Sequence, residues 1–118
     1  MDREGEKTII INYKEFSRVK IMVGTIIDVQ DFPEARRPAY KLQIDFGEFG
    51  IKRSSAQITN YEKNKLVGMK IVAVTNFAPK QVANFISEVL VLGALTSEGV
   101  ILLTPTDPEK AKPGDLVA

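Results

Sequence analysis

Residues 76–88 bring an amide, a cation and a hydroxyl into one short stretch, directly before an apolar run. Asn76, Lys80 and Ser87 supply these groups, and Val-Leu-Val-Leu follows at residues 89–92. A loop of this composition can present donors and a positive charge beside the rigid wall of a strand. Such groups suit an extended polymer with phosphates and exposed bases. They do not suit bond-breaking chemistry.

The composition excludes the commonest catalytic and metal-binding side chains. The 118 residues contain no Cys and no His, which rules out disulfides, thiolate nucleophiles, Cys/His zinc sites and the usual general base near neutral pH. The carboxylate pairs Asp28/Asp31 and Asp45/Glu48 are typical of ordinary strand-edge and loop charges. A carboxylate or lysine mechanism stays open in principle, but we expect a protein that is not an enzyme and that uses no cofactor and no metal.

Length and hydropathy predict a single cytoplasmic domain. No apolar run approaches the roughly 20 residues that cross a bilayer, so we expect no membrane insertion. The first seven residues are polar and lack the apolar core of a signal peptide. We interpret residues 1–12 as an N-terminal extension and residues 13–118 as the domain.

Charge is distributed unevenly along the chain. The net charge is only +1, yet residues 52–80 hold six bases and one acid, while residues 1–34 hold seven acids and five bases. This distribution is typical of a local anion-binding face on a nearly neutral protein. Chance clustering of surface lysines explains the charges equally well.

The alternation of apolar and polar residues predicts an all-β fold. Short runs bounded by Gly and Pro, with a small helical or irregular element over residues 56–67, are typical of an OB-fold, the five-stranded Greek-key barrel. A short helix and N- and C-terminal extensions complete the expected architecture. The expected strands are residues 20–31, 39–46, 51–55, 69–75, 88–93 and 100–104.

Several local features are also expected. The isoleucines of residues 8–12 could form a short strand, and residues 13–19 a helical turn. Within the first strand, Ile21, Val23, Ile27 and Val29 share one phase of the alternation, and Gly24 is typical of a bulge or sharp bend. We expect a helical turn in the loop 76–87 and a brief pairing of residues 115–117.

An OB-fold binds oligonucleotides across its second and third strands, between the loops that follow the first and fourth strands. Each of these elements carries donors or cations here. Asn76 could instead shape a turn, Ser87 could bond the local backbone, and Arg36 with Arg37 could be a solvated loop tip. The candidate RNA-binding residues are Arg36, Arg37, Lys41, Lys52, Arg53, Ser54, Ser55, Asn76, Lys80 and Ser87.

Aromatic residues are weaker candidates for base stacking. Tyr40 and Tyr61 are the better ones, whereas Phe77 and Phe85 are more typical of a core or an interface.

Two strands are apolar on both faces, which predicts a homodimer. Residues 89–92 and 100–103 contain no polar side chain, and a soluble monomer avoids exposing such a surface. Either the terminal segments or a second subunit must cover it, and we favour the second subunit. The candidate interface residues are Phe16, Leu90, Leu92, Ile101 and Leu103.

Six blocks of sequence resemble the tRNA-binding-domain family, in order and without large gaps over residues 15–117. The resemblance is closest to the branch of small homodimers described as tRNA-binding export chaperones. Many members read Ser-Glu-Gly-Met where this chain reads Ser-Glu-Val-Leu, and the segment before Phe16 is longer than expected. The blocks are Val-Gly-Thr-Ile (23–26), Phe-Pro-Glu-Ala-Arg (32–36), Lys-Leu-Gln-Ile-Asp-Phe-Gly (41–47), Lys-Arg-Ser-Ser-Ala-Gln-Ile-Thr (52–59), Gly-Met-Lys-Ile-Val-Ala-Val-Thr-Asn-Phe (68–77) and Ser-Glu-Val-Leu-Val-Leu-Gly (87–93).

The resemblance implies an OB barrel, a two-fold dimer and a tRNA-facing surface on each subunit. It also implies a role in keeping preproteins competent for export. The first hypothesis is therefore a tRNA-binding protein of the secretion-chaperone type. The alternative is a peptide-binding chaperone for unfolded preproteins, working with the secretion machinery, in which RNA binding is incidental. A purely structural partner of a synthetase would predict loss of the basic loops.

Overall fold

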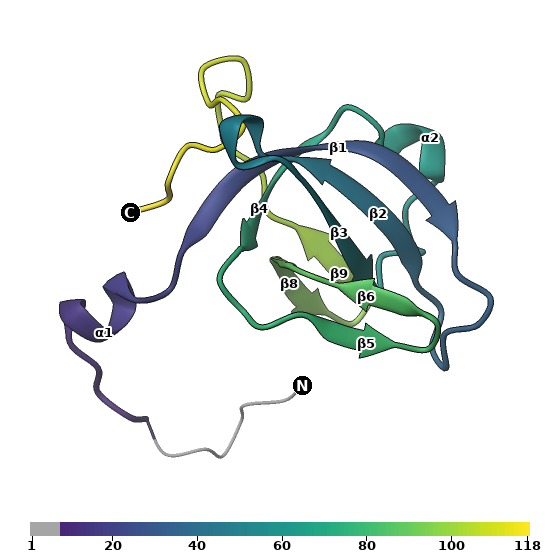
Figure 1. Ribbon diagram of the computed structural model, residues 1–118, viewed down its shortest axis with the longest axis horizontal. Coiled ribbons are helices and arrows are strands. Elements are labelled where there is room, and N and C mark those ends of the chain that lie inside the picture. The colour runs from purple at the N-terminus through teal and green to yellow at the C-terminus, as the bar shows by residue number, and fades with distance from the viewer. Residues whose placement is uncertain (1–7) are drawn as a thin grey trace.

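The computed structural model describes residues 8–118, and strands make up most of its regular structure (Figure 1). Helical structure is limited to α1 (Tyr13–Ser17), α2 (Lys63–Leu66) and the 3-10 helix Gly47–Phe49. The strands are β1 (Ile21–Asp31), β2 (Tyr40–Asp45), β3 (Ile51–Ala56), β4 (Lys70–Val74), β5 (Lys80–Val82), β6 (Phe85–Ser87), β7 (Leu90–Val91), β8 (Gly93–Thr96) and β9 (Gly99–Leu102).

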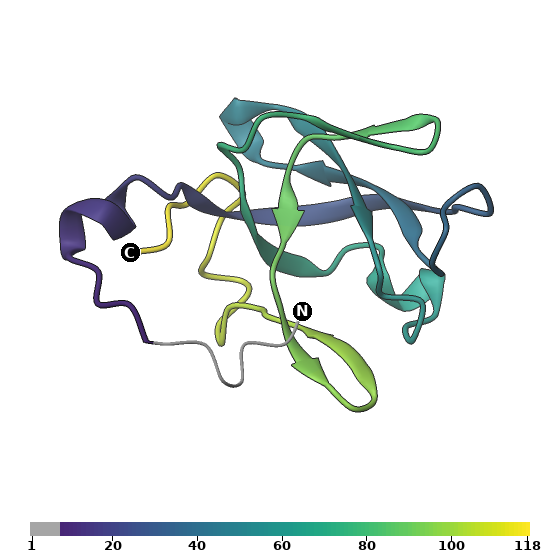
Figure 2. The same ribbon diagram turned by 90° about the horizontal axis from the view of Figure 1, so that it is seen from below.

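Five of these strands form one antiparallel sheet that curls into a barrel. Its order is β3-β2-β1-β4-β7, so β4 returns past α2 to lie on the other side of β1 from β2. Two separate hairpins, β5–β6 and β8–β9, leave this sheet on either side of β7. Figures 1 and 2 show the long β1 running across the barrel. The predicted OB-fold, with a small helix between the third and fourth barrel strands, is confirmed.

Side chains help to close the barrel between β3 and the segment that precedes β7. Glu88 N–H donates to the Arg53 carbonyl (2.8 Å), and Arg53 N–H donates back to the Glu88 carboxylate (2.8 Å). Ser55 N–H donates to the Ser87 hydroxyl (3.0 Å). The edge amides of β3 thus find acceptors although β7 forms no ladder with β3.

The core follows the alternation of β2. Leu42 and Ile44 are buried, and Ile26 and Ile71 from β1 and β4 pack with them in the same cluster. Gly24 permits this packing, because a Cβ at that position would lie 2.6 Å from the Ile44 side chain. The alternation predicted for residues 39–46 is therefore confirmed.

The expected phase of β1 is wrong at Ile27, whereas Val29 of the same expected phase packs against the core. The register shifts between Ile26 and Asp28, so Ile27 is the extra residue of a bulge. Ile26 is fully buried and Ile27 is exposed, the reverse of the expected pattern. The bulge was expected at Gly24. It lies three residues further along the strand, at Ile27.

Four further local expectations can be compared with the structure. Residues 8–12 do not form a strand, and the loop 76–87 folds as the hairpin β5–β6 rather than a helical turn. The strand expected over 88–93 is divided between β7 and β8. The brief pairing of the C-terminal segment is confirmed by a bridge between Met22 and Leu116.

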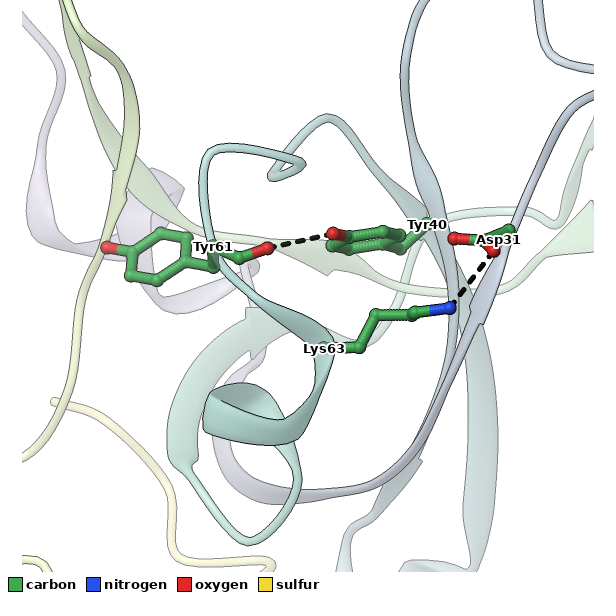
Figure 3. Close-up of polar contacts among 4 residues, drawn as sticks. All are labelled: Asp31, Tyr40, Tyr61 and Lys63. Atoms are coloured by element: carbon green, nitrogen blue, oxygen red, sulfur yellow. Dashed lines mark hydrogen bonds and ion pairs between the residues drawn. The ribbon is translucent and has the colours of Figure 1, made fainter.

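Polar contacts anchor the segment before α2 to the barrel (Figure 3). The Tyr40 hydroxyl donates to the Tyr61 carbonyl (2.8 Å), and the Tyr61 hydroxyl accepts from Leu102 N–H (3.1 Å). Lys63 Nζ lies 3.0 Å from Asp31 Oδ2. Both tyrosines are therefore held by the scaffold, which makes them poor surfaces for stacking bases.

None of the helices within residues 8–118 is long and apolar enough to cross a membrane.

Candidate nucleic-acid interface

An open groove of about 1160 Å³ lies between the loop after β1, the end of β3 and the hairpin β5–β6. We call it the basic groove. Arg36 and Arg37 line it from the loop, Lys80 lines it from β5, and Ser55 and Ser87 lie between them. Five of the ten predicted RNA-binding residues therefore share one surface.

The basic groove is lined by more cationic than acidic side chains. Its charged lining residues are Arg36, Arg37, Lys80, Glu34 and Glu88. One oxygen of Glu88 already accepts a hydrogen bond from the Arg53 backbone. Across residues 8–118, none of the three cations forms an ion pair. They are exposed, so an anionic ligand can reach them without first displacing a carboxylate.

A row of cations and aromatic rings lies beside the groove. Lys41 Nζ is 5.6 Å from the Phe32 ring centroid, and the Arg53 guanidinium is 5.5 Å from that of Phe85. The two rings meet edge to face at 5.6 Å. This row connects the loop after β1 to β6, so it holds the two walls of the groove relative to each other.

Lys52 and Ser54 lie on the opposite side of β3 from this row. Lys52 pairs with Ile44 and Ser54 pairs with Leu42, and directly paired residues share a face of the sheet. Ser54 is fully buried and donates to the Val89 carbonyl (3.0 Å). Its predicted contact with RNA is therefore wrong, because its hydroxyl faces the barrel interior. Lys52 lies outside the lining of the groove.

The Asn76 side chain holds the start of β1. Its Oδ1 accepts from Lys20 N–H (2.9 Å), and its Nδ2 donates to the Arg18 carbonyl (2.7 Å). These two bonds give Asn76 a structural role, which was the alternative to its predicted contact with RNA. Asn76 does not line the basic groove.

The Ser87 hydroxyl also has a structural partner. It accepts from Ser55 N–H as part of the barrel closure. Both serines line the groove, yet the Ser87 oxygen that would meet a ligand already holds β6 against β3.

Sequence reasoning missed the apolar part of the groove. Phe77, Val82 and Leu90 line it together with Ala83 at the tip of the hairpin, and 56% of the Phe77 side chain is exposed. In the sequence, Phe77 stands directly before Ala-Pro-Lys. This pattern favoured a place in a core or an interface over a role in base stacking. The exposed ring beside three cations is a surface on which a base can stack.

Four of the five candidate dimer residues lie along β7 to β9, and one of these, Leu90, also lines the basic groove. Val89 and Leu102 are buried, while Leu90, Ile101 and Leu103 remain 42–49% exposed. Leu92, which follows the same alternation, is half-buried, as is Phe16 in α1. We call Leu90, Leu92, Ile101 and Leu103 the apolar band.

Comparison with known proteins decides the family. A family model described as "Putative tRNA binding domain" matches residues 21–115, most of the chain. The chain belongs to this family. The matched range begins with β1 and ends in the C-terminal segment that pairs with it, so it covers the barrel and the basic groove. Residues 8–20, including α1, lie outside it.

Solved structures resemble most of the chain. A structure titled as the CsaA chaperone protein from Picrophilus torridus is 59% identical, covers 92% of this chain and 100% of its own, and superposes with a TM-score of 0.88. One titled as chaperone CsaA from Bacillus anthracis is 43% identical over 93% of this chain and 100% of its own, with a TM-score of 0.85.

Among curated proteins, the methionine–tRNA ligase of Nanoarchaeum equitans is 31% identical over 92% of this chain. That match covers only 14% of the ligase. The chain thus spans about one-seventh of the length of this relative.

Proposed function

We propose that the protein binds tRNA through the basic groove, as a homodimer and without catalysis. The observation that carries this proposal is the meeting of Arg36 and Arg37 with Lys80, although the loop and the hairpin that supply them are more than 40 residues apart in the chain. Membership in the tRNA-binding-domain family supports the same ligand. The binding unit of the proposal is residues 13–118, with residues 1–12 as an extension, and its site of action is the cytoplasm.

The groove chemistry favours an unpaired segment of the tRNA. Guanidinium groups pair with phosphates in two-pronged fashion, and a lysine ammonium acts as a point charge. The exposed Phe77 ring lies in the same groove, where it can stack on a base that is not already in a duplex. Three phosphate contacts on a single strand would give a salt slope of about −2.1.

Dimerisation follows in this proposal from the apolar band. Its exposed leucines and isoleucine form a surface that a soluble monomer avoids, and a second copy can bury it by two-fold symmetry. Such a dimer presents two basic grooves, which raises the avidity for tRNA if one molecule reaches both.

A peptide-binding chaperone is the second candidate. Phe77, Val82 and Leu90 make part of the groove apolar, and an extended polypeptide can place side chains against such a surface. The similarity to structures titled as CsaA chaperones supports it. Its clients would be unfolded preproteins on their way to the secretion machinery.

A salt series of tRNA binding tests the proposal. We expect the affinity of the unaltered protein to fall steeply with salt, and Lys80→Ala to flatten the slope by about 0.7. Lys110→Ala, in the exposed C-terminal segment outside the groove, is the matched control and leaves the slope unchanged.

A competition assay separates the two candidates. The tRNA site is supported if unfolded polypeptide displaces tRNA only weakly and if Lys80→Ala does not change this displacement. Salt-independent tRNA binding together with tight, Lys80-independent binding of unfolded polypeptide would overturn it in favour of the chaperone.

A further inference from the structure

Three consecutive isoleucines precede α1 and are exposed. Ile9 is 82%, Ile10 is 91% and Ile11 is 56% exposed. We call residues 8–11 the isoleucine arm. All three consecutive isoleucines are exposed, so the arm presents an apolar surface. An exposed segment of this kind is typical of one that is covered by a partner.

The structure sets the direction in which the arm leaves the barrel. Asn76 holds the backbone of Arg18 and Lys20, which fixes the end of α1 to the barrel. At the other end of α1, the Asn12 side chain accepts from Glu15 N–H (2.9 Å), and the Glu15 carboxylate accepts from Asn12 N–H (3.3 Å). This capping box fixes how the chain enters the helix.

The arm lies apart from its own barrel. Figures 1 and 2 both show α1 and the purple segment before it standing clear of the strands. Residues 8–11 form no hydrogen bond with any other described residue. The barrel that carries the arm therefore does not cover it.

The apolar band begins close to the point where α1 joins β1. Val74 pairs with Ile21 of β1 on one side and with Leu90 of β7 on the other. The band therefore lies on the side of the barrel from which the arm departs.

The apolar band would form only part of a stable dimer interface. Its four members, Leu90, Leu92, Ile101 and Leu103, come from short strands and their ends, whereas a stable interface commonly uses about 20–30 residues a side. An additional apolar segment from each subunit would enlarge the buried surface.

We propose that the isoleucine arm of one copy packs against the apolar band of a second copy, and that the exchange is reciprocal. This inference rests on the proposed homodimer. The family model begins at residue 21, so the arm lies outside the part of the chain that the family shares. A second copy is the occupant that provides both an unpaired arm and an unpaired band.

Single cysteines test the exchange directly, because the chain has none of its own. Ile10→Cys and Ile101→Cys are prepared as separate full-length proteins and mixed under oxidising conditions. We expect a covalent dimer that contains one chain of each kind. As a control, Ile10→Cys is mixed with Val67→Cys, which is exposed at the end of α2, and gives no enrichment of the mixed dimer.

The double variant with both cysteines in one chain distinguishes exchange from folding back. Exchange predicts covalent dimers at low protein concentration, whereas an arm that folds onto its own band gives an internally bridged monomer and overturns the inference.

Asparagine substitutions measure how much the arm contributes. Ile9→Asn, Ile10→Asn and Ile11→Asn together should weaken dimerisation by about 100-fold in sedimentation analysis, since each isoleucine loses apolar burial. The control Val67→Asn, at the exposed end of α2, should leave it unchanged. A dimer with unchanged affinity in the arm variant refutes the exchange while leaving the homodimer intact. An unaltered protein that stays monomeric at high concentration refutes both.

Discussion

The hairpins β5–β6 and β8–β9 have similar backbones and different surfaces. Each is a two-stranded antiparallel unit attached to the same barrel beside β7. The turn of β8–β9 is supported by the Thr96 hydroxyl, which donates to the Gly99 carbonyl (2.7 Å), and by Gly99 at a φ of 106°. The turn of β5–β6 instead holds Ala83 at a φ of 51°, a conformation that costs alanine about 1 kcal/mol.

Their side chains explain why the two hairpins suit different partners. Lys80 on β5 lines the basic groove, while Ile101 on β9 is exposed on the outer side of the barrel. A cation beside an open groove remains hydrated until an anion arrives. An exposed isoleucine on a strand is stabilised when another surface removes it from water. Topology alone therefore does not distinguish a ligand-binding hairpin from a self-associating one.

The largest expected effect comes from placing charge on β8–β9. Ile101→Asp combined with Leu103→Asp should weaken the dimer by about 100-fold or more, because two carboxylates would be buried without partners. Sedimentation velocity over a range of concentrations measures this. Binding of tRNA by each isolated groove should change little. An unaltered dimer would show that the interface lies elsewhere.

Removing charge from the basic groove should produce the complementary result. Arg36→Ala with Lys80→Ala should reduce tRNA affinity by about 30-fold, at roughly 1 kcal/mol for each lost charge-assisted contact. A double-mutant cycle measured by fluorescence anisotropy would show coupling if both residues contact the same ligand segment. The dimerisation constant should not change. Equal losses in the Lys110→Ala control would indicate a general charge effect instead.

A smaller effect is expected from Phe85. Phe85→Ala removes the edge-to-face contact with Phe32 and the stacking of Arg53, together about 1–2 kcal/mol. The hairpin should then sit less firmly against β3, lowering tRNA affinity several-fold with no change in the salt slope. Amide exchange of β5 and β6 should speed up. Phe85→Leu, which keeps apolar bulk, should lose less.

The smallest effect is expected at the turn. Ala83→Gly should raise the free energy of unfolding by about 0.5–1 kcal/mol, since glycine accepts a positive φ without the alanine cost. Thermal denaturation measures the change. A matched Gly99→Ala on the other hairpin should be destabilising, because it introduces a Cβ at positive φ. Loss of stability in Ala83→Gly would contradict the strain argument.

The barrel could be predicted from the sequence because its strongest signals are local. The alternation through Leu42, Ile44 and Phe46 specifies a half-buried strand and needs no knowledge of its neighbours. The exposure of Ile27 could not be predicted, since a bulge inserts one extra residue there and shifts the alternation of the residues that follow. The hairpin β5–β6 was missed because each strand has only three residues and its turn uses alanine in place of glycine.

The site was predicted in part, for a similar reason. The types of residue indicated donors and cations, and the topology brought Arg36, Arg37 and Lys80 into one groove. Which donors already have partners depends on contacts between distant segments. Asn76 bonds the backbone 56 and 58 residues before it, and no local pattern reports this. Exposure of Phe77 likewise depends on how the hairpin lies.

The closure between β3 and the residues before β7 has a consequence for motion within the barrel. Two of its three contacts are made by side chains, the Ser87 hydroxyl and the Glu88 carboxylate. Rotation about a few side-chain bonds is enough to release them, without separating a full ladder of backbone pairs. The amides of Arg53 and Ser55 should therefore exchange with deuterium through brief local opening well before those of β1. The barrel should open first between β3 and the residues that precede β7.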